Sequence, residues 1–158
     1  MRRIREEKNP FPKSRIQIPV YRASSRKGDI SEWESNLYFF SPKPRSSEFG
    51  SHVIKAWINI QRPFTFTESQ VQDVVGSMPE DDITYMVQAE QLEKESYYDT
   101  DYDILVRAIL GERRDLWEYP YFVDALKDSR YDGVIGTDWF GGDQEYVVFD
   151  RSQIEVIE

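Results

Sequence analysis

The sequence predicts an α+β fold in which two groups of short strands flank a helical middle segment. Residues 52–60 alternate between apolar and polar side chains, and residues 131–157 contain short apolar stretches separated by polar turns. Between these groups, Thr67 and Pro79 carry signals for the starts of helices. Strands grouped apart from helices are typical of α+β proteins. We therefore expect one antiparallel core with a helical insert over residues 67–130.

The N-terminal part of the chain predicts an arm followed by two strands. Residues 1–15 are rich in basic residues and show no periodicity, so we expect a mobile or loosely docked arm. Residues 17–22 form the first predicted strand, which Pro19 confines to a sheet edge or to a late start. A second strand over 37–40 stops at Ser41 because Pro42 cannot continue a ladder. One turn of helix is expected near 44–50.

Helix signals in the middle segment come from caps and from apolar spacing. Thr67, with Gln70 three residues later, predicts a capping box. Gly111 is a plausible residue for ending a helix. Four helices are expected, from Thr67 to about Gly76, from Pro79 to about Lys94, from about Ile104 to Gly111, and from Asp115 or Pro120 to about Arg130. Final strands are expected over 132–136, 145–149 and 154–157.

Composition limits the classes of function. The chain has 158 residues, enough for one domain (1–158) with a real core, and its 15% of aromatic residues argues against disorder. Without cysteine there are no disulfides and no thiolate chemistry, and a single histidine, His52, makes a histidine metal site or a serine triad improbable. No apolar run is long enough to span a membrane and no secretory signal is present. We expect a cytoplasmic protein with no membrane partner.

Charge is unevenly distributed along the chain. The formal net charge of −9 comes from 20 basic and 29 acidic residues, and such a surface repels phosphate backbones, so general nucleic-acid binding is disfavoured. Basic residues gather in the first 45 positions, whereas acidic residues dominate from Glu68 onward. The basic part is suited to a local anionic ligand such as a pyrophosphate, or is a solvated arm.

Two carboxylates precede a predicted core strand near the C-terminus. Because side chains alternate along a strand, Asp143 and Glu145 share one face with Val147 and Phe149. A solvated strand edge is the ordinary explanation for such residues. Arg22 and Ser41 also lie at the ends of predicted strands, where a surface ion pair or strand termination accounts for them equally well.

Together these residues and their surroundings resemble a known family. The segments VYRASS, LYFFSPKPRSSEFG and VIKAWINIQRPF, followed at a distance by YDGVIG and EYVVFDRSQI, resemble the ADP-ribosyltransferase-like domains of phage and bacterial polyvalent proteins. These domains resemble the wider arginine–serine–glutamate superfamily of ADP-ribosyltransferases. The resemblance covers residues 18–66 and 131–157. It implies a split antiparallel β-core of the ADP-ribosyltransferase type that binds NAD between two small sheets.

The resemblance also implies roles for single residues. Arg22 resembles the arginine that holds the NAD phosphates, a task suited to a planar guanidinium. Ser41 resembles the serine that orients the nicotinamide ribose and the glutamate. Glu145 resembles the catalytic glutamate, which stabilises the positive charge that develops on the ribose as nicotinamide leaves. Phe49 is a candidate to pack against nicotinamide. Further cofactor-binding candidates adjoin the first two motif residues: Tyr21, Ala23 and Phe40.

Two departures from the family pattern concern the acceptor in one case and the hydrogen bonding of the second motif, reduced to one hydroxyl, in the other. Asp143 stands where arginine-modifying members have a glutamate or glutamine, and Phe-Ser-Pro replaces Ser-Thr-Ser in the second motif. The expected function is NAD-dependent mono-ADP-ribosyl transfer, or NAD glycohydrolysis, with an unknown protein or small-molecule acceptor. The alternatives are a catalytically silent module that binds a nucleotide or a protein partner, and a glycosidase that uses Asp143 and Glu145 as its carboxylate pair, about 7 Å apart.

Overall fold

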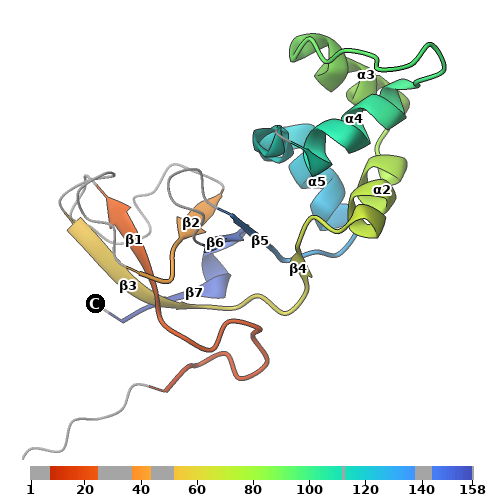
Figure 1. Ribbon diagram of the computed structural model, residues 1–158. Coiled ribbons are helices and arrows are strands. Elements are labelled where there is room, and N and C mark those ends of the chain that lie inside the picture. Colours follow the sequence, from red (N-terminus) through yellow and green to blue (C-terminus); the bar gives the residue numbers. More distant parts are fainter. Residues whose placement is uncertain (1–7, 25–36, 44–51, 112, 138–143, 158) are drawn as a thin grey trace, which may run out of the picture. The chain divides into compact units, whose positions relative to one another are not determined.

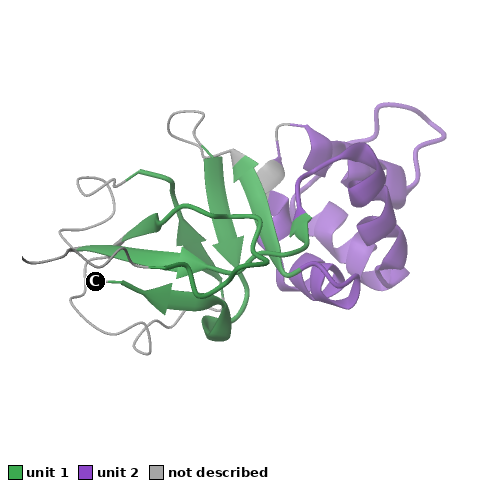
Figure 2. Cartoon of the chain, turned by 90° about the horizontal axis from the view of Figure 1, so that it is seen from below, with its two compact units in different colours: residues 1–63, 132–158 green, residues 64–131 purple. Residues whose placement is uncertain are grey.

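The computed structural model describes residues 8–24, 37–43, 52–111, 113–137 and 144–157 (Figure 1). The chain forms two compact units, one of residues 1–63 and 132–158 and the other of residues 64–131 (Figure 2). We call the first the β unit and the second the helical unit. The mixture of two sheets and several helices is an α+β fold, as predicted from the sequence.

The β unit is built on two sheets. One has the strand order β1-β3-β7, with β1 at Val20–Ser24, β3 at His52–Ile58 and β7 at Ile154–Val156. The other has the order β2-β6-β5-β4, from strands β2 (Tyr38–Phe40), β6 (Gln144–Val148), β5 (Gly133–Thr137) and the two-residue β4 (Pro63–Phe64). The pairs β1–β3, β3–β7, β2–β6 and β5–β6 are antiparallel. The strands therefore form the split antiparallel core expected from the sequence.

One apolar cluster joins these two sheets. Val20, Ala56 and Ile58 from the first sheet lie in the same buried cluster as Tyr146 and Val148 from the second. Since side chains alternate along each strand, these residues identify the face that each sheet turns toward the other. We call these the inner faces.

The edge position of β1 follows from Pro19. Proline lacks the N–H that a ladder needs, and β1 starts directly after it, at Val20, as an edge strand. The segment before Pro19 is packed at Ser14, which is 5% exposed. The Ser14 hydroxyl donates to the Ile58 carbonyl at 2.8 Å and accepts from the Ile60 N–H at 3.0 Å. The arm expected over residues 1–15 therefore ends in a docked segment.

Asp132 holds together the two chain segments that leave the β unit. Its carboxylate accepts hydrogen bonds from the backbone N–H groups of Gln61 and Arg62, at 2.9 and 2.8 Å. The Gln153 amide donates to the carbonyls of Asn59 and Asp132, at 2.9 and 2.6 Å. These bonds satisfy backbone groups where the ladder ends.

The helical unit contains the helices predicted for the middle of the chain. These are α2 (Glu68–Ser77), α3 (Glu80–Ala89), α4 (Asp101–Leu110), the 3₁₀ helix η2 (Arg114–Glu118) and α5 (Pro120–Asp128). A further 3₁₀ turn, η3 (Arg151–Gln153), precedes β7 in the β unit. Each α-helix of the helical unit buries an apolar stripe, such as Ile104, Leu105 and Ile109 of α4. No helix among the described residues is long and apolar enough to cross a membrane.

Helix ends differ from the predictions in three places. Thr67 caps α2 by accepting from Gln70 N–H, but the Gln70 side chain accepts from Thr65 N–H instead of closing the capping box. The helix expected to reach Lys94 ends at Ala89, where Gln91 adopts a φ of 52°. Gly111 follows α4 with a φ of −92° and is not left-handed.

Candidate functional site

The two sheets of the β unit meet edge to edge at Tyr21 and Ser41. Tyr21 N–H donates to the Ser41 carbonyl at 2.8 Å, and Ser41 N–H donates to the Tyr21 carbonyl at 2.9 Å. Tyr21 belongs to β1, and Ser41 directly follows β2. This bridge brings together two of the motifs that the sequence analysis singled out, although they lie far apart in the chain.

Arg22 is the charged residue of this junction. It pairs with Ile54 across β1 and β3, which places it on the inner face together with Val20. Its side chain is half-buried, and Nη1 donates to the Phe39 carbonyl at 3.4 Å. Burial lowers the pKa of the Arg22 guanidinium, whereas the nearby Tyr38 phenol acts to raise it. A partly desolvated guanidinium attracts anions more strongly than an exposed one.

The strand register brings Glu145 to the same end of the second sheet as Ser41. Phe40 pairs with Tyr146 across the antiparallel strands β2 and β6. Ser41 follows Phe40 and Glu145 precedes Tyr146, so these two residues lie opposite each other. Both sit at the strand ends next to the bridge with Tyr21. Glu145 is half-buried and pairs with Gly136 of β5. Glu145 lies on the same face of its sheet as Val147, which is the face opposite to Tyr146. Arg22, in contrast, lies on the inner face of its own sheet.

Ser41 itself is held mainly by local hydrogen bonds. Its hydroxyl donates to the Lys43 carbonyl at 2.7 Å and lies 3.5 Å from the Tyr21 carbonyl. The half-buried Ser41 side chain thus fixes the turn that follows β2. The turn keeps the bridge with β1 in place.

Two tyrosines and a glutamine near the site were missed in the sequence analysis. Tyr38 occupies the same inner face as Phe40, packs on the apolar cluster and lies close enough to Arg22 to influence its pKa. The Tyr146 hydroxyl donates to the Gln144 side-chain oxygen at 2.8 Å, and burial raises the pKa of Tyr146. Tyr38 is two residues before Phe40, so strand alternation was the signal that would have found it.

Of the other predicted site residues, the structure describes Phe40 and Ala23. Phe40 is 2% exposed and belongs to the core cluster. Ala23 pairs with Val53 in the β1–β3 ladder. Phe49 and Asp143 lie outside the described residues.

The junction combines a guanidinium on the inner face of one sheet with a carboxylate at a strand end of the other sheet. Arg22 supplies a fixed positive charge, Glu145 supplies a carboxylate, and Ser41 and Tyr38 supply hydroxyl groups. Within the described parts of the chain, no group of three His, Cys, Asp or Glu side chains is arranged to hold a metal ion.

Comparison with known families gives one match. The model of one family, described as ADP-ribosyltransferase in polyvalent proteins, matches residues 21–158 and so includes both sheets and the helical unit. No curated protein and no solved structure gives a significant match. The matched region begins at Tyr21, in the strand that carries Arg22, and contains Ser41 and Glu145. The chain belongs to the family of ADP-ribosyltransferases found in polyvalent proteins.

Proposed function

We propose that this protein cleaves the nicotinamide–ribose bond of NAD at the junction of its two sheets. The ADP-ribose is then transferred to a single acceptor residue or molecule, or to water. The observation that carries the proposal is the Tyr21–Ser41 bridge, which joins the strand that contains Arg22 to Ser41, while the register of β2 and β6 sets Glu145 opposite Ser41. NAD has a negatively charged diphosphate, and cleavage of its nicotinamide–ribose bond produces a cation. A site for NAD therefore needs a positive group for the diphosphate and a negative group for the ribosyl cation.

Arg22 is the proposed ligand of the NAD diphosphate. A guanidinium gives paired, charge-assisted hydrogen bonds to phosphate oxygens, and these bonds strengthen where water is partly excluded. The half-buried position of Arg22 on the inner face supports this role. Its bond to the Phe39 carbonyl holds the side chain next to β2, the strand that leads to Ser41.

Glu145 is the proposed catalytic residue. As nicotinamide leaves, positive charge develops on the ribose, and a carboxylate that accepts a hydrogen bond from the 2′-hydroxyl stabilises that charge. Because this interaction is strongest in the transition state, it lowers the barrier by about 3 kcal/mol in well-studied sites of this kind. Ser41, at the adjacent strand end, is the proposed residue for orienting the ribose and the carboxylate.

The test is nicotinamide release from NAD by Glu145→Gln. This variant keeps the size of the side chain but removes its charge, so turnover should fall by at least about a hundredfold while NAD affinity, measured by calorimetry, hardly changes. Glu155→Gln is the matched control, because Glu155 is an exposed glutamate on β7 of the same unit. The melting temperatures of all three proteins should agree closely.

Three results would contradict the proposal in different ways. Unchanged turnover in Glu145→Gln would remove this residue from catalysis, and a variant inactive only because it melts earlier would make Glu145 structural. NAD binding without any nicotinamide release in the parent protein would identify a silent nucleotide-binding module.

Asp143→Asn tests the acceptor side: it should impair transfer to an acceptor more than it impairs NAD hydrolysis, because the residue stands where related enzymes contact the acceptor.

A further inference from the structure

The helical unit contains a groove that the proposed NAD chemistry does not use. It has a volume of about 550 Å³ and lies along one side of α4, facing the first turns of α2. The lining residues come from these two helices and the turns beside α4: Glu68, Gln72, Asp99, Tyr102, Asp103, Val106, Arg107, Leu110 and Gly111. Its volume is in the range of pockets that hold small ligands.

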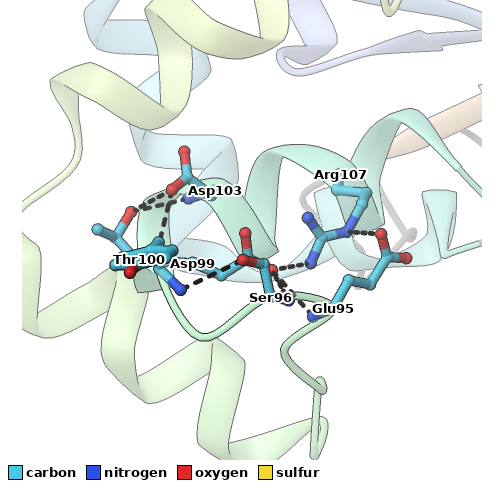
Figure 3. A network of polar contacts seen from close by, with 7 residues as sticks. Glu95, Ser96, Asp99, Thr100, Asp103 and Arg107 are labelled. Atoms are coloured by element: carbon cyan, nitrogen blue, oxygen red, sulfur yellow. Dashed lines mark hydrogen bonds and ion pairs between the residues drawn. The ribbon is translucent and has the colours of Figure 1, made fainter.

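The charges in this groove favour a cation. Three carboxylates and one guanidinium line it, and the guanidinium, from Arg107, is already engaged. Arg107 Nη2 lies 2.8 Å from the Asp99 carboxylate and Nε lies 3.3 Å from the Glu95 carboxylate, as Figure 3 shows. Asp103 accepts from the backbone N–H of Thr100 as part of the cap of α4. Arg107 is therefore shared between two acids, and the groove keeps an excess of negative charge.

Glu68 is the carboxylate best placed to receive a cation from outside. It is exposed, it accepts a hydrogen bond only weakly, from the Gln72 amide at 3.3 Å, and no ion pair to it is formed among the described residues. Leu110, half-buried on α4, and Val106 one turn before it, which is 8% exposed, line the same groove with apolar side chains. A negative rim next to apolar surface suits a side chain with a methylene stem and a charged head, such as arginine or lysine.

Two further observations indicate that the occupant is part of a protein. Tyr97 and Tyr98 directly precede Asp99 of the groove, are 89% and 86% exposed, and pack edge to face with ring centroids 5.4 Å apart. Exposed tyrosines provide contact area for proteins and a face for cations. The helical unit, residues 64–131, also contains sixteen acidic and six basic residues, which repels nucleic acids and attracts basic segments.

We propose that the groove between α2 and α4 binds an arginine-bearing segment of a partner protein, with Glu68 on the guanidinium and Val106 and Leu110 along the stem. Tyr97 and Tyr98 contact neighbouring residues of the same segment. This site is formed entirely within the helical unit and does not depend on the proposed chemistry of Glu145.

The experiment measures binding of a fluorescently labelled peptide of alternating arginine and serine to the full chain at low ionic strength. A peptide of alternating glutamate and serine is the control ligand. Glu68→Gln should weaken binding about two- to fivefold, the range for one exposed charge pair. Arg107→Met should strengthen binding by a similar factor, because it releases Asp99 and Glu95 from their internal cation. Tyr97→Ser combined with Tyr98→Ser should weaken it.

Asp73→Asn is the matched control for Glu68→Gln. Asp73 is an exposed acid of the same helix α2 that does not line the groove, so its loss should leave the affinity nearly unchanged. Equal effects of Asp73→Asn and Glu68→Gln would overturn the proposal, because general charge attraction would then explain the binding. Equal binding of the basic and acidic peptides, or no binding of either, would also overturn it. Glu145→Gln should bind the peptide like the parent protein, which separates this test from that of the proposed function.

Discussion

The guanidinium of Arg22 lies between solvent and the inner faces of two sheets. Burial lowers its pKa and Tyr38 opposes that shift, so the charge persists but is poorly hydrated. Such a charge gains more from a bound phosphate than an exposed arginine does, since water screens the interaction less. Its contribution should therefore appear in binding of NAD and not only in turnover.

Arg22→Ala should weaken NAD binding more than Glu145→Gln does. Arg22 meets charge that NAD already carries, whereas Glu145 meets charge that forms only in the transition state. Arg22→Lys should recover part of the lost affinity, because an ammonium keeps the charge but lacks the planar fork. Calorimetry with NAD measures these differences, and Arg151→Ala, at an exposed position of η3, is the control. Equal affinity in the parent and Arg22→Ala would remove Arg22 from the site.

Ser14→Ala should destabilise the β unit. The Ser14 hydroxyl bonds the Ile58 carbonyl, the Ile60 N–H and the Ile16 N–H from a position only 5% exposed, so its loss leaves buried backbone groups without their partner. The expected cost is about 2 kcal/mol of unfolding free energy. Urea denaturation measures it, with Ser152→Ala at an exposed position as the control. A loss no larger than that of the control would show that water satisfies these groups.

Single residues were predictable from the sequence where their partners are local. Pro19 correctly predicted an edge position for β1, although the strand was expected from residue 17 and starts at Val20, and Thr67 correctly placed the start of α2. Ser14 gave no such signal, because its hydrogen-bond partner Ile58 is 44 residues away. The contact between Arg22 and Phe39 likewise depends on how the sheets meet and not on neighbours in the chain.

Capping differs between the helices of the helical unit. Thr100 and Asp103 form a full capping box on α4: Thr100 Oγ1 accepts from Asp103 N–H at 3.2 Å, and Asp103 Oδ2 accepts from Thr100 N–H at 3.1 Å. Thr67 makes a single bond to Gln70 N–H at 3.3 Å. Two reciprocal bonds fix a helix start more firmly than one.

Thr100→Ala should therefore cost more stability than Thr67→Ala. We expect a loss of about 1 kcal/mol or more for Thr100→Ala and a smaller loss for Thr67→Ala. Thermal unfolding followed by circular dichroism at 222 nm compares the two variants directly. A larger loss in Thr67→Ala would mean that the cap of α2 supports more of the helical unit than its single hydrogen bond indicates.

The segment before α4 should make the helical unit sensitive to acid. Arg107, followed by the backbone N–H of Glu95, holds the pKa of Asp99 below its usual value. A carboxyl with a lowered pKa in the folded protein stabilises it above the unfolded pKa of about 4, and this stabilisation is lost as the pH falls through the folded value. The melting temperature should fall below about pH 4. Arg107→Met should lower the melting temperature at pH 7 but make its decline in acid less steep. An equally steep decline in this variant would show that other carboxyls cause the acid sensitivity.

The end of α3 could not be predicted because its signal lies in backbone geometry, which recurs at the end of α5. After α3, Gln91 has a φ of 52°, its N–H donates to Gln88, and the Leu92 N–H donates to Val87. After α5, Arg130 has a φ of 68° and the same bonds recur at Lys127 and Leu126. Glycine normally occupies this left-handed position, and without it the sequence pattern continues past the true end.

At the scale of the whole molecule, charge is divided between the units. The helical unit has a formal net charge of −10, whereas the remaining residues carry fourteen basic and thirteen acidic side chains, a net charge of +1. Like charges repel one another within a compact unit, and this repulsion reaches about 30 Å at 0.01 M salt but only about 8 Å at 0.15 M.

Salt should therefore stabilise the helical unit more than the β unit. Between 0.01 and 0.15 M sodium chloride, amide hydrogen exchange should slow in α2, α3, α4 and α5 and change less in β1, β3 and β6. Sodium sulfate is not a suitable replacement, because it strengthens burial in general. Equal slowing in both units would show that the division of charge has no energetic effect at this range of salt.

The fold was largely predictable from the sequence, whereas the candidate site was predictable only in part. Strand alternation and helix caps predicted the α+β arrangement, and the family match agrees with it. Arg22, Ser41 and Glu145 were selected by motif, and the bridge and the strand register explain how three distant segments meet. The burial of Phe40 could not be predicted, because an aromatic residue next to a motif has the same sequence pattern whether it lines a cleft or fills a core.

The hydrogen bonds of Asp132 hold the two ends of the long middle segment as close together as the ends of a short turn. The Asp132 carboxylate accepts hydrogen bonds from the N–H groups of Gln61 and Arg62. These bonds lie within the β unit, so they hold the start and the end of the middle segment close together whatever its length. Closing a longer segment between fixed ends raises the entropic cost only slowly. We therefore expect this position to accept foreign domains: a fluorescent protein or another binding module spliced in place of residues 64–131 should leave the β-core foldable.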